Sequence, residues 1–511
     1  MTTRKRIGWR GRSWTYRLAA VAGLVTLSGG GLLQAASDDL RLVEAVKAQR
    51  WEAVRPLLAH GVDVNATQGD GATALHWAVY WDDHETAELL IRAGAGVDAA
   101  NAYEVTPLWL ACANASGPMV ERLLAAGADA RATLTSGETA LMACARTGSV
   151  DAVEALLNRG VEVDAREASE NQTALMWATA QRHPAVVRLL LEHGADPNAR
   201  SRIRREVISR RLQSDLRYGE RSRSLGSDAE ETDIGGFTPL LFAARVGDVE
   251  SADLLLAAGA DVNDTGPDGA SALVVATHSG HGALARFLLD EGANPNAAIV
   301  GYTALHAAVL QGDLKVVEAL LDHGASPNAQ ITQGTRVARN GQVLYLGEHL
   351  LGATPFALAA KFIEVEIMRV LLDAGADAAL PLKNGWTPVS LAAGAGWRYG
   401  TWDRRDRALI RLPAAQHELY DERRTLEAVK IAAAAGSDVN AVDEDGNTAL
   451  HYVVDKGFPD VVAFLTESGA DVNVENRRGQ TPLTRFARRR PEVSDEATRA
   501  TGDLLHGLGA R

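Results

Sequence analysis

The sequence of 511 residues is poor in the residue patterns that build catalytic and metal sites. It has only two cysteines, Cys112 and Cys144, so neither a disulfide framework nor a cysteine-rich zinc site is expected. It contains no His-Glu-x-x-His, Gly-x-Ser-x-Gly or Gly-Lys-Ser/Thr phosphate-loop motif. Those patterns mark zinc proteases, serine hydrolases and nucleotide-binding proteins. We therefore expect no enzymatic activity, no cofactor and no metal.

Long apolar runs are missing after residue 33, so no transmembrane segment is expected in the mature chain. Before that point, residues 1–17 are basic without any acid, and residues 18–33 are small and apolar. This is the pattern of a secretory signal peptide, residues 1–36, cleaved after Ala35 or Ala36. The alternative is a membrane anchor, for which the apolar run is short against the roughly 20 residues of a spanning helix. The chain is expected to be exported, either periplasmic or secreted.

Positive charge is also scarce, because 52 basic residues stand against 65 acidic ones and the formal net charge is −13. Removal of the basic signal peptide makes the mature chain still more acidic. Nucleic acid is therefore not expected to bind along its length.

What the sequence does have is a repeat. Eleven times a Thr or Ser is followed two residues later by Leu, Phe or Val, then by an Ala-rich stretch, a Leu pair and a Gly. The first residues of these sets are Thr73, Thr106, Thr139, Thr173, Thr238, Ser271, Thr303, Thr354, Thr387, Thr448 and Thr481. Five gaps between them are 33 residues, one is 34 and one is 32, while the other three are 65, 51 and 61. The period predicts a repeat architecture with three insertions.

Each period predicts two helices and a loop. In residues 106–108, Thr can cap a helix through its hydroxyl while Pro takes the first helical position. A second apolar run, such as residues 187–191, ends at Gly194, which suits the left-handed residue after a helix. Turn-forming Ala-Asp-Val-Asn stretches come next in several units.

This pattern closely resembles the ankyrin repeat, whose signature is Thr-Pro-Leu-His-x-Ala followed by Leu-Leu and Gly-Ala-Asp. The closest copy is residues 303–308, which read TALHAA, with Leu pairs and Gly-Ala at residues 320–325. The resemblance implies an all-α repeat solenoid of about twelve stacked helix-turn-helix units, with atypical caps. Departures from the signature histidine include Trp109, Met142, Met176 and Ser390.

The period and its gaps divide the chain into a signal peptide and repeats with insertions. The segments are the signal peptide at 1–36, repeats at 38–199, an Arg-rich insertion at 200–234, repeats at 235–329, a short insertion at 330–351, and repeats at 352–511 with an insertion at 397–424 and a C-terminal cap.

Two residue types could suggest chemistry, and the resemblance gives both a structural role. The signature histidines His76, His306 and His451 are expected to tie adjacent turns together by hydrogen bonds. Cys112 and Cys144 fall at small-residue positions of consecutive first helices. Because helices of stacked units lie about 10 Å apart, we expect two buried thiols and no bridge.

Partner binding is expected at the ends of the first helices, which by resemblance lie on the concave side. These positions vary between units while the framework repeats, which fits either recognition or neutral drift. The candidate residues are Tyr80, Trp81, Arg146, Arg245, Lys361 and Phe362. At Tyr80-Trp81 and at Lys361-Phe362, aromatic residues stand beside charged ones, which is typical of interface anchors.

The insertions supply further candidates. Residues 200–223 hold nine Arg, and Ile203, Val207, Leu212 and Leu216 fall roughly on one helical face. This predicts either a basic amphipathic helix for an anionic surface or a solvated loop. The short insertion predicts a hairpin at Asn340-Gly341. The third insertion is rich in Trp, Tyr and Arg, the residue types most enriched at binding hot spots. These side chains either contact a partner or pack against neighbouring repeats. They are Trp397, Arg398, Tyr399, Trp402, Arg404 and Arg405.

We therefore expect an exported, monomeric protein-binding scaffold of bacterial type that acts through its concave surface and insertions. Two alternatives stay open. One is an adaptor to an anionic envelope surface or nucleic acid through the Arg-rich insertion, and the other is a host-directed effector.

Overall fold

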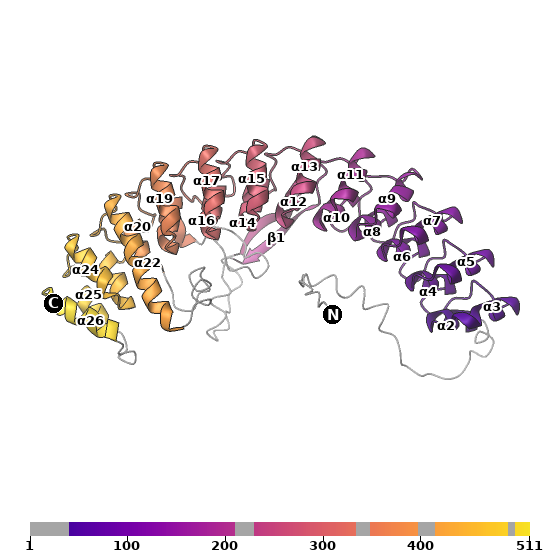
Figure 1. The fold of residues 1–511 in the computed structure, drawn as a ribbon, viewed down its shortest axis with the longest axis horizontal. Coiled ribbons are helices and arrows are strands. Elements are labelled where there is room, and N and C mark those ends of the chain that lie inside the picture. Colours follow the sequence, from indigo (N-terminus) through magenta and orange to yellow (C-terminus); the bar gives the residue numbers. More distant parts are fainter. Residues whose placement is uncertain (1–39, 210–228, 334–347, 397–413, 489–495, 511) are drawn as a thin grey trace. The chain divides into compact units, whose positions relative to one another are not determined.

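The computed structural model describes residues 40–209, 229–333, 348–396, 414–488 and 496–510 (Figure 1). The chain divides into two structural units, Met1–Gly96 and Val97–Arg511, which we describe separately. The regular structure of the described residues consists of 24 α-helices in twelve pairs, two strands and two short 3-10 helices. The predicted all-α repeat fold of about twelve units is confirmed.

The first unit holds two helix pairs. They are α2 (Arg41–Lys47) with α3 (Trp51–Ala59), and α4 (Ala74–Tyr80) with α5 (His84–Arg92). Their apolar faces form a core that includes the fully buried Leu42, Val54, Leu75 and Leu90. Asn65 ties the two pairs together, because its side-chain amide donates to the Gly94 carbonyl at 3.1 Å and its carbonyl accepts from the Gly96 N–H at 2.7 Å.

The second unit repeats the same pair ten times. Its first helices are α6 (Pro107–Ala113), α8 (Ala140–Thr147), α10 (Ala174–Ala180), α12 (Pro239–Val246), α14 (Ala272–His278), α16 (Ala304–Gln311), α18 (Pro355–Phe362), α20 (Pro388–Ala392), α23 (Ala449–Val453) and α25 (Pro482–Ala487). Its second helices are α7 (Gly117–Ala125), α9 (Val150–Leu157), α11 (Pro184–Glu192), α13 (Val249–Ala257), α15 (Gly282–Asp290), α17 (Leu314–Asp322), α19 (Val365–Asp373), α22 (Ala414–Ala434), α24 (Pro459–Glu467) and α26 (Glu496–Gly507). The 3-10 helices are η3 (Glu348–Leu350) and η4 (Val454–Lys456). Neighbouring first helices contact one another in one row, and neighbouring second helices contact one another in a second row (Figure 1).

The repeated Thr, or Ser271 before α14, precedes each first helix except α2, as the sequence predicts. The N–H of Met142 donates to the Thr139 hydroxyl at 3.1 Å, and the N–H of Ala357 donates to Thr354 at 3.2 Å. These bonds satisfy main-chain donors that the first turn of a helix leaves without a partner. Proline occupies the first turn of α6, α12, α18, α20 and α25, where its missing N–H costs nothing.

The insertions do not interrupt the stack of repeats. Asn198 precedes the Arg-rich insertion, yet its side chain donates to the Gly259 carbonyl of the next repeat at 3.1 Å. Asn328 reaches across the short insertion to the Gly375 carbonyl at 3.0 Å and accepts from the N–H of Asp377 at 2.8 Å. The inserted residues therefore leave from the loops while the helix pairs keep their neighbours.

The described part of the Arg-rich insertion is a β-hairpin, so the expectation of an amphipathic helix is wrong there. Strand β1 (Ile203–Ser209) pairs antiparallel with β2 (Ala229–Gly235), from Ile203 opposite Gly235 to Ser209 opposite Ala229. The spacing of four between Ile203 and Val207 places two residues on one face of a helix, but also on one face of a strand. Leu212 and Leu216 lie outside the described residues.

Polar contacts attach the base of this hairpin to the repeats. The Arg202 N–H donates to the Glu170 carbonyl at 2.6 Å, and Arg204 forms an ion pair with the Glu170 carboxylate at 2.8 Å. Arg205 pairs with Asp233 on the opposite strand at 3.1 Å, while Arg200 pairs with the Asp264 carboxylate. Three positive charges at the base of the insertion, those of Arg200, Arg204 and Arg205, are thus paired with acidic side chains of the same chain.

The other two insertions are described only at their ends. The hairpin predicted at Asn340-Gly341 lies outside the described residues, and so do residues 397–413 of the third insertion. From Ala414 onward the third insertion is helical, because α22 runs without a break from there to Ala434.

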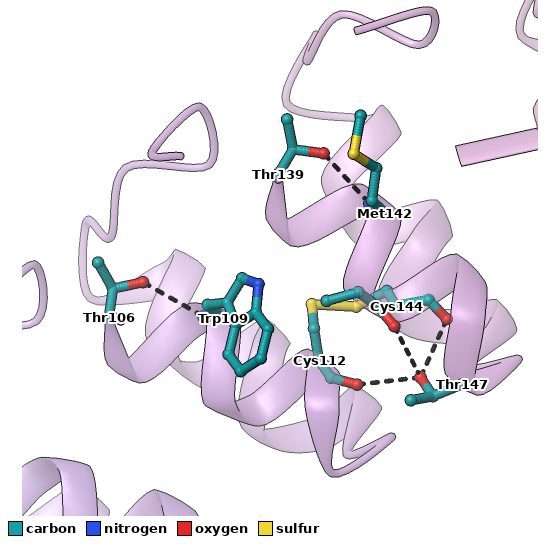
Figure 2. The surroundings of a disulfide bond; sticks show 8 residues. Thr106, Trp109, Cys112, Thr139, Met142, Cys144 and Thr147 are labelled. Atoms are coloured by element: carbon teal, nitrogen blue, oxygen red, sulfur yellow. Dashed lines mark hydrogen bonds between the residues drawn. A yellow bond between two sulfur atoms is a disulfide. The ribbon is translucent and has the colours of Figure 1, made fainter. Parts of the chain in front are cut away.

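Cys112 and Cys144 form a disulfide, which corrects the expectation of two separate thiols (Figure 2). Their Cα atoms are 4.4 Å apart, within the range that a bridge requires. The expected spacing of about 10 Å applies to helices with ordinary side chains at the contact. Here the neighbours Ala111 and Ala143 are fully buried alanines, so the backbones of α6 and α8 approach more closely.

Two signature histidines link adjacent repeats, as expected. His306 Nε2 lies 3.2 Å from the Ala353 carbonyl, and His451 Nε2 lies 2.9 Å from the Gln480 carbonyl. A carbonyl only accepts, so Nε2 carries the proton in each ring. Among the described helices, none has the length and apolar character to cross a membrane.

Candidate functional site: side chains of the first helices

An exposed aromatic cluster lies at the end of α4 in the first unit. The rings of Trp77 and Tyr80 have centroids 5.6 Å apart, and those of Tyr80 and Trp81 are 4.9 Å apart, both edge to face. Trp77 is buried, whereas Tyr80 is 38% exposed and Trp81 is 40% exposed. Lys47 places its ammonium 5.0 Å from the centre of a Trp77 ring. We call Trp77, Tyr80 and Trp81 the aromatic cluster.

The three rings of the aromatic cluster support one another in fixed positions. Trp77 fixes the inner end because its own side chain is held within the core of the unit. Edge-to-face contacts then hold the two outer rings in defined orientations. Tyr80 and Trp81 therefore present apolar area with little rotational freedom left to lose, which favours binding.

A second candidate surface lies on α6, α8 and α10 in the second unit. The guanidinium of Arg146 is 6.0 Å from the centre of a Trp109 ring and 5.2 Å from the centre of a Trp177 ring. These distances are typical of cation–π contacts. Glu138 lies 3.9 Å from the same guanidinium. We call Trp109, Arg146 and Trp177 the tryptophan–arginine stack.

Burial controls the electrostatics of this stack. It lowers the pKa of Arg146 from its usual value, and the Glu138 carboxylate offsets part of that effect. The side chain stays 24% exposed, so one part of the guanidinium reaches the surface while its faces lie against indoles. Arg146 is thus a half-buried, oriented cation rather than the free surface charge that its position in the sequence suggests.

The other predicted residues of the first helices fall in different environments. Arg245 is half-buried, and its main-chain carbonyl lies 3.1 Å from His281 Nε2. Lys361 and Phe362 are only 7% and 8% exposed, so the expectation of an exposed anchor there is wrong. The Lys361 ammonium donates to the Gly396 carbonyl at 3.3 Å. The chain leaving the next first helix, α20, thus covers the end of α18.

The candidate residues of the third insertion lie outside the described residues. They are Trp397, Arg398, Tyr399, Trp402, Arg404 and Arg405. Their role in binding stays a prediction.

A partly buried polar network, which the sequence does not predict, lies near the third insertion. The Trp386 indole N–H lies 3.1 Å from the Asp443 carboxylate, to which the Tyr452 hydroxyl also donates. Asn447 extends the network to Arg485, whose guanidinium donates to its side-chain carbonyl at 3.0 Å. Burial, and then Asp443, raises the pKa of Tyr452 well above its usual value. The network joins three consecutive repeats on either side of the insertion, so it stabilises the scaffold there.

Two further histidines, His183 and His281, each contact the end of the first helix of the preceding repeat. His183 Nε2 lies 3.1 Å from the Arg146 carbonyl, and His281 makes the same contact with Arg245. A side chain at Gly148 would overlap the His183 ring, since its Cβ would lie 2.5 Å from Nδ1. The signal in the sequence is the recurring pair of a glycine after the first helix and a histidine in the next repeat.

The comparisons with known proteins agree with this geometry. A family model described as ankyrin repeats (3 copies) matches residues 42–133, 108–201, 223–299, 240–331 and 417–493. Together these spans cover more than half of the 511 residues. The chain is an ankyrin-repeat protein.

Relatives of this ankyrin-repeat protein match only part of it. Neurogenic locus notch homolog protein 1 of Xenopus tropicalis is 32% identical over 143 residues, which is 26% of this chain and 6% of that protein. The Danio rerio protein of the same name is 32% identical over 231 residues, 44% of this chain and 8% of that protein. An ankyrin repeat-containing protein of Schizosaccharomyces pombe is 41% identical over 49 residues, 10% of this chain and 24% of that protein. The chain spans less than a tenth of these Notch relatives, so the likeness concerns the repeats.

Ankyrin repeats act as protein-interaction scaffolds, and the described surfaces of this ankyrin-repeat protein suit that role. Within the described ranges, no three His, Cys, Asp or Glu side chains gather as metal ligands would. The aromatic cluster and the tryptophan–arginine stack instead offer apolar area and one oriented charge. Aromatic and arginine side chains are the types enriched at protein interfaces.

Proposed function

We propose that this ankyrin-repeat protein is a non-catalytic, monomeric scaffold that binds a partner protein through exposed side chains of its first helices. The observation that carries the proposal is the exposure of Tyr80 and Trp81 on the buried support of Trp77. Large aromatic residues in contact with a rigid base are the side chains on which protein interfaces depend most. Stacked repeats hold that base still, so binding orders few new groups.

The tryptophan–arginine stack is the second contact region in this proposal. Arg146 is oriented by two indoles and can offer its exposed edge to a carboxylate or carbonyl of the partner. Arg245, which is half-buried, lies on a nearby first helix of the same unit. Trp397 to Arg405 of the third insertion are proposed to extend the contact, whereas the buried Lys361 and Phe362 are not part of it.

The alternative of an anionic surface or nucleic acid as the ligand has less support. Arg200, Arg204 and Arg205 at the base of the Arg-rich insertion pair with acidic side chains of the same chain. Each of these carboxylates offsets one positive charge, which lowers the attraction of the base of the insertion for an anion. Deletion of residues 203–234 and measurement of salt-dependent retention on anionic vesicles tests this, because the scaffold proposal predicts unchanged retention.

We further propose that the chain is exported, as a bacterial protein of the periplasm or the exterior. The basic and then apolar residues 1–36, which lie outside the described residues, support this, and so does the Cys112–Cys144 disulfide. Mass spectrometry of the intact protein from its own cells should find a chain beginning at Ala36 or Ser37. A chain that begins at Met1 in the cytoplasm would contradict export. A host-directed effector differs only in the compartment reached afterwards.

Site-directed photo-crosslinking tests the proposed binding surface. A photo-crosslinking amino acid is placed at positions 82 and 114, which are exposed at the ends of α4 and α6. Matched controls carry it at positions 121 and 154, which are exposed on the second helices α7 and α9. We expect one discrete adduct in the cell envelope fraction from positions 82 and 114 and none from the controls. Adducts that form only from the second helices would refute the proposed surface.

A further inference from the structure

The disulfide between Cys112 and Cys144 is not required by the fold. The two cysteines stand six residues after Thr106 and five residues after Thr139. At the same two places other repeats carry buried alanines, Ala244 with Ala276 and Ala360 with Ala392. Two first helices therefore pack in this chain without a covalent link. Among the described first helices, the bridge is particular to α6 and α8.

The bridge lies next to the tryptophan–arginine stack. Trp109 precedes Cys112 by three residues on α6, which places both on neighbouring turns of one helix face (Figure 2). Arg146 follows Cys144 by two residues on α8. The Thr147 hydroxyl adds a second link between the helices by donating to the Cys112 carbonyl at 2.9 Å (Figure 2). The relative position of α6 and α8 sets the distance between the Trp109 ring and the Arg146 guanidinium.

Burial decides when the bridge can form and break. Cys112 and Cys144 are both fully buried. Thiol–disulfide exchange requires a thiolate to approach a sulfur atom, so a buried bridge is protected while the repeats stay closed. When a dithiol such as dithiothreitol does reach it, the S–S bond breaks. The dithiol supplies two electrons and two protons and becomes a cyclic disulfide, and both cysteines become thiols. The bridge therefore has to form during folding in an oxidising compartment.

We propose that the Cys112–Cys144 bridge is a positioning element that makes the tryptophan–arginine stack dependent on oxidation. The bridged chain holds α6 and α8 at the separation that keeps Arg146 between the two indoles, and the reduced chain does not. Repeats contact only their neighbours, so loss of the bridge acts on this interface and leaves distant repeats unchanged. The consequence for partner binding rests on the proposed function, whereas the structural consequence does not.

Hydrogen exchange with mass spectrometry on the full mature chain tests the structural part. Three forms are compared: the oxidised wild type, wild type reduced in denaturant and refolded with dithiothreitol, and the double variant Cys112→Ala/Cys144→Ala. The variant carries the alanines of the other repeats and therefore guards against misfolding caused by free thiols. We expect the amides of α6 and α8 to lose roughly a hundredfold in protection in both unbridged forms, since the bridge closes a 32-residue separation. Amides of α14 and α16 are the internal reference and should not change.

Protection of α6 and α8 at the oxidised level in either unbridged form overturns the proposal, and so does an equal loss in α14 and α16. Dithiothreitol without denaturant should leave the bridge intact over the same period. Rapid reduction under native conditions would contradict the protective role of burial.

Crosslinking from position 114 then separates this proposal from the proposed function. We expect the adduct of the oxidised chain to weaken in the double variant. An oxidised chain that gives no adduct at all refutes partner binding at this surface, while the exchange result still decides whether the bridge holds α6 and α8 together. An undiminished adduct in the double variant shows that the bridge does not control binding.

Discussion

Protonation of His306 is expected to destabilise its repeat as the pH falls below neutrality. His306 is fully buried on α16, and its Nε2 donates to the Ala353 carbonyl. Its Nδ1 therefore carries no proton and accepts from the Thr303 N–H at 3.2 Å. A second ring proton would face that donor inside the protein. Burial accordingly lowers the pKa of His306 from 6.5 to about 4.

The difference between the pKa of His306 in the unfolded chain and in the folded chain sets the sign and size of the effect on stability. In the unfolded chain the imidazole takes up its proton near pH 6.5, whereas in the folded chain it does so near pH 4. Between these values the unfolded state binds more protons, so stability is fully present above pH 6.5 and is lost as the pH falls towards 4. At pH 5 the loss of stability is about 2 kcal/mol, and below pH 4 it approaches about 3 kcal/mol.

Native-state hydrogen exchange of the α16 amides at pH 7.5 and pH 5 measures this loss on the full chain. The control is His306→Met, because Met142 and Met176 occupy the same position in two other repeats. We expect the local free energy of opening to fall by about 2 kcal/mol more in the wild type than in the variant. The same pH dependence in both proteins would refute the assignment of the effect to His306.

Other predictions concern helix capping and the inserted hairpin. Thr354→Ala removes the hydroxyl that accepts from the Ala357 N–H at the start of α18. We expect the free energy of unfolding, measured in urea, to fall by about 1 kcal/mol, whereas Thr354→Ser should keep most of that stability. Gly235→Ala places a Cβ 2.0 Å from the Arg202 carbonyl oxygen at a φ of +88°, so β1 and β2 should separate and become sensitive to protease. Gly259 has a similar φ of +93°, but nothing lies within 4 Å of a Cβ added there. Gly259→Ala should therefore lower stability only by the conformational cost of the left-handed backbone, about 1–2 kcal/mol. An equal effect at both glycines would show that the contact with Arg202 is unimportant.

The repeat pattern is sufficient to predict the helix pairs because each repeated Thr can begin a helix through contacts within its own neighbouring residues. Thr139 and Thr354 cap helices through bonds within three residues, so no distant contact has to be known. The cysteines show the opposite case. A typical helix separation excluded a bridge, but Ala111 and Ala143 let α6 and α8 approach to a Cα separation of 4.4 Å at the cysteines. The small size of those alanines was visible in the sequence and was the missing signal.

The exposure of a candidate side chain can be predicted where it depends on the helix itself, but not where another segment covers that side chain. Tyr80 and Trp81 are exposed because they end α4. Lys361 and Phe362 occupy the same place on α18, but the chain near Gly396 covers them. The sequence predicts either an amphipathic helix or a solvated loop at Ile203, and the strand is missed because a spacing of four residues fits one face of a helix or of a strand. Its partner strand, β2, begins twenty residues after β1 ends, so the pairing is not visible in the local sequence around Ile203.

A binding isotherm measured with the crosslinked partner, once purified, tests the scaffold account most directly. The mature wild-type chain, Trp81→Ala and the second-helix control Glu154→Ala are titrated under the same oxidising conditions. We expect at least roughly a tenfold loss of affinity for Trp81→Ala, the size expected of an aromatic anchor, and less than a twofold change for Glu154→Ala. Equal affinity of the wild type and Trp81→Ala, with loss only in Glu154→Ala, would contradict it.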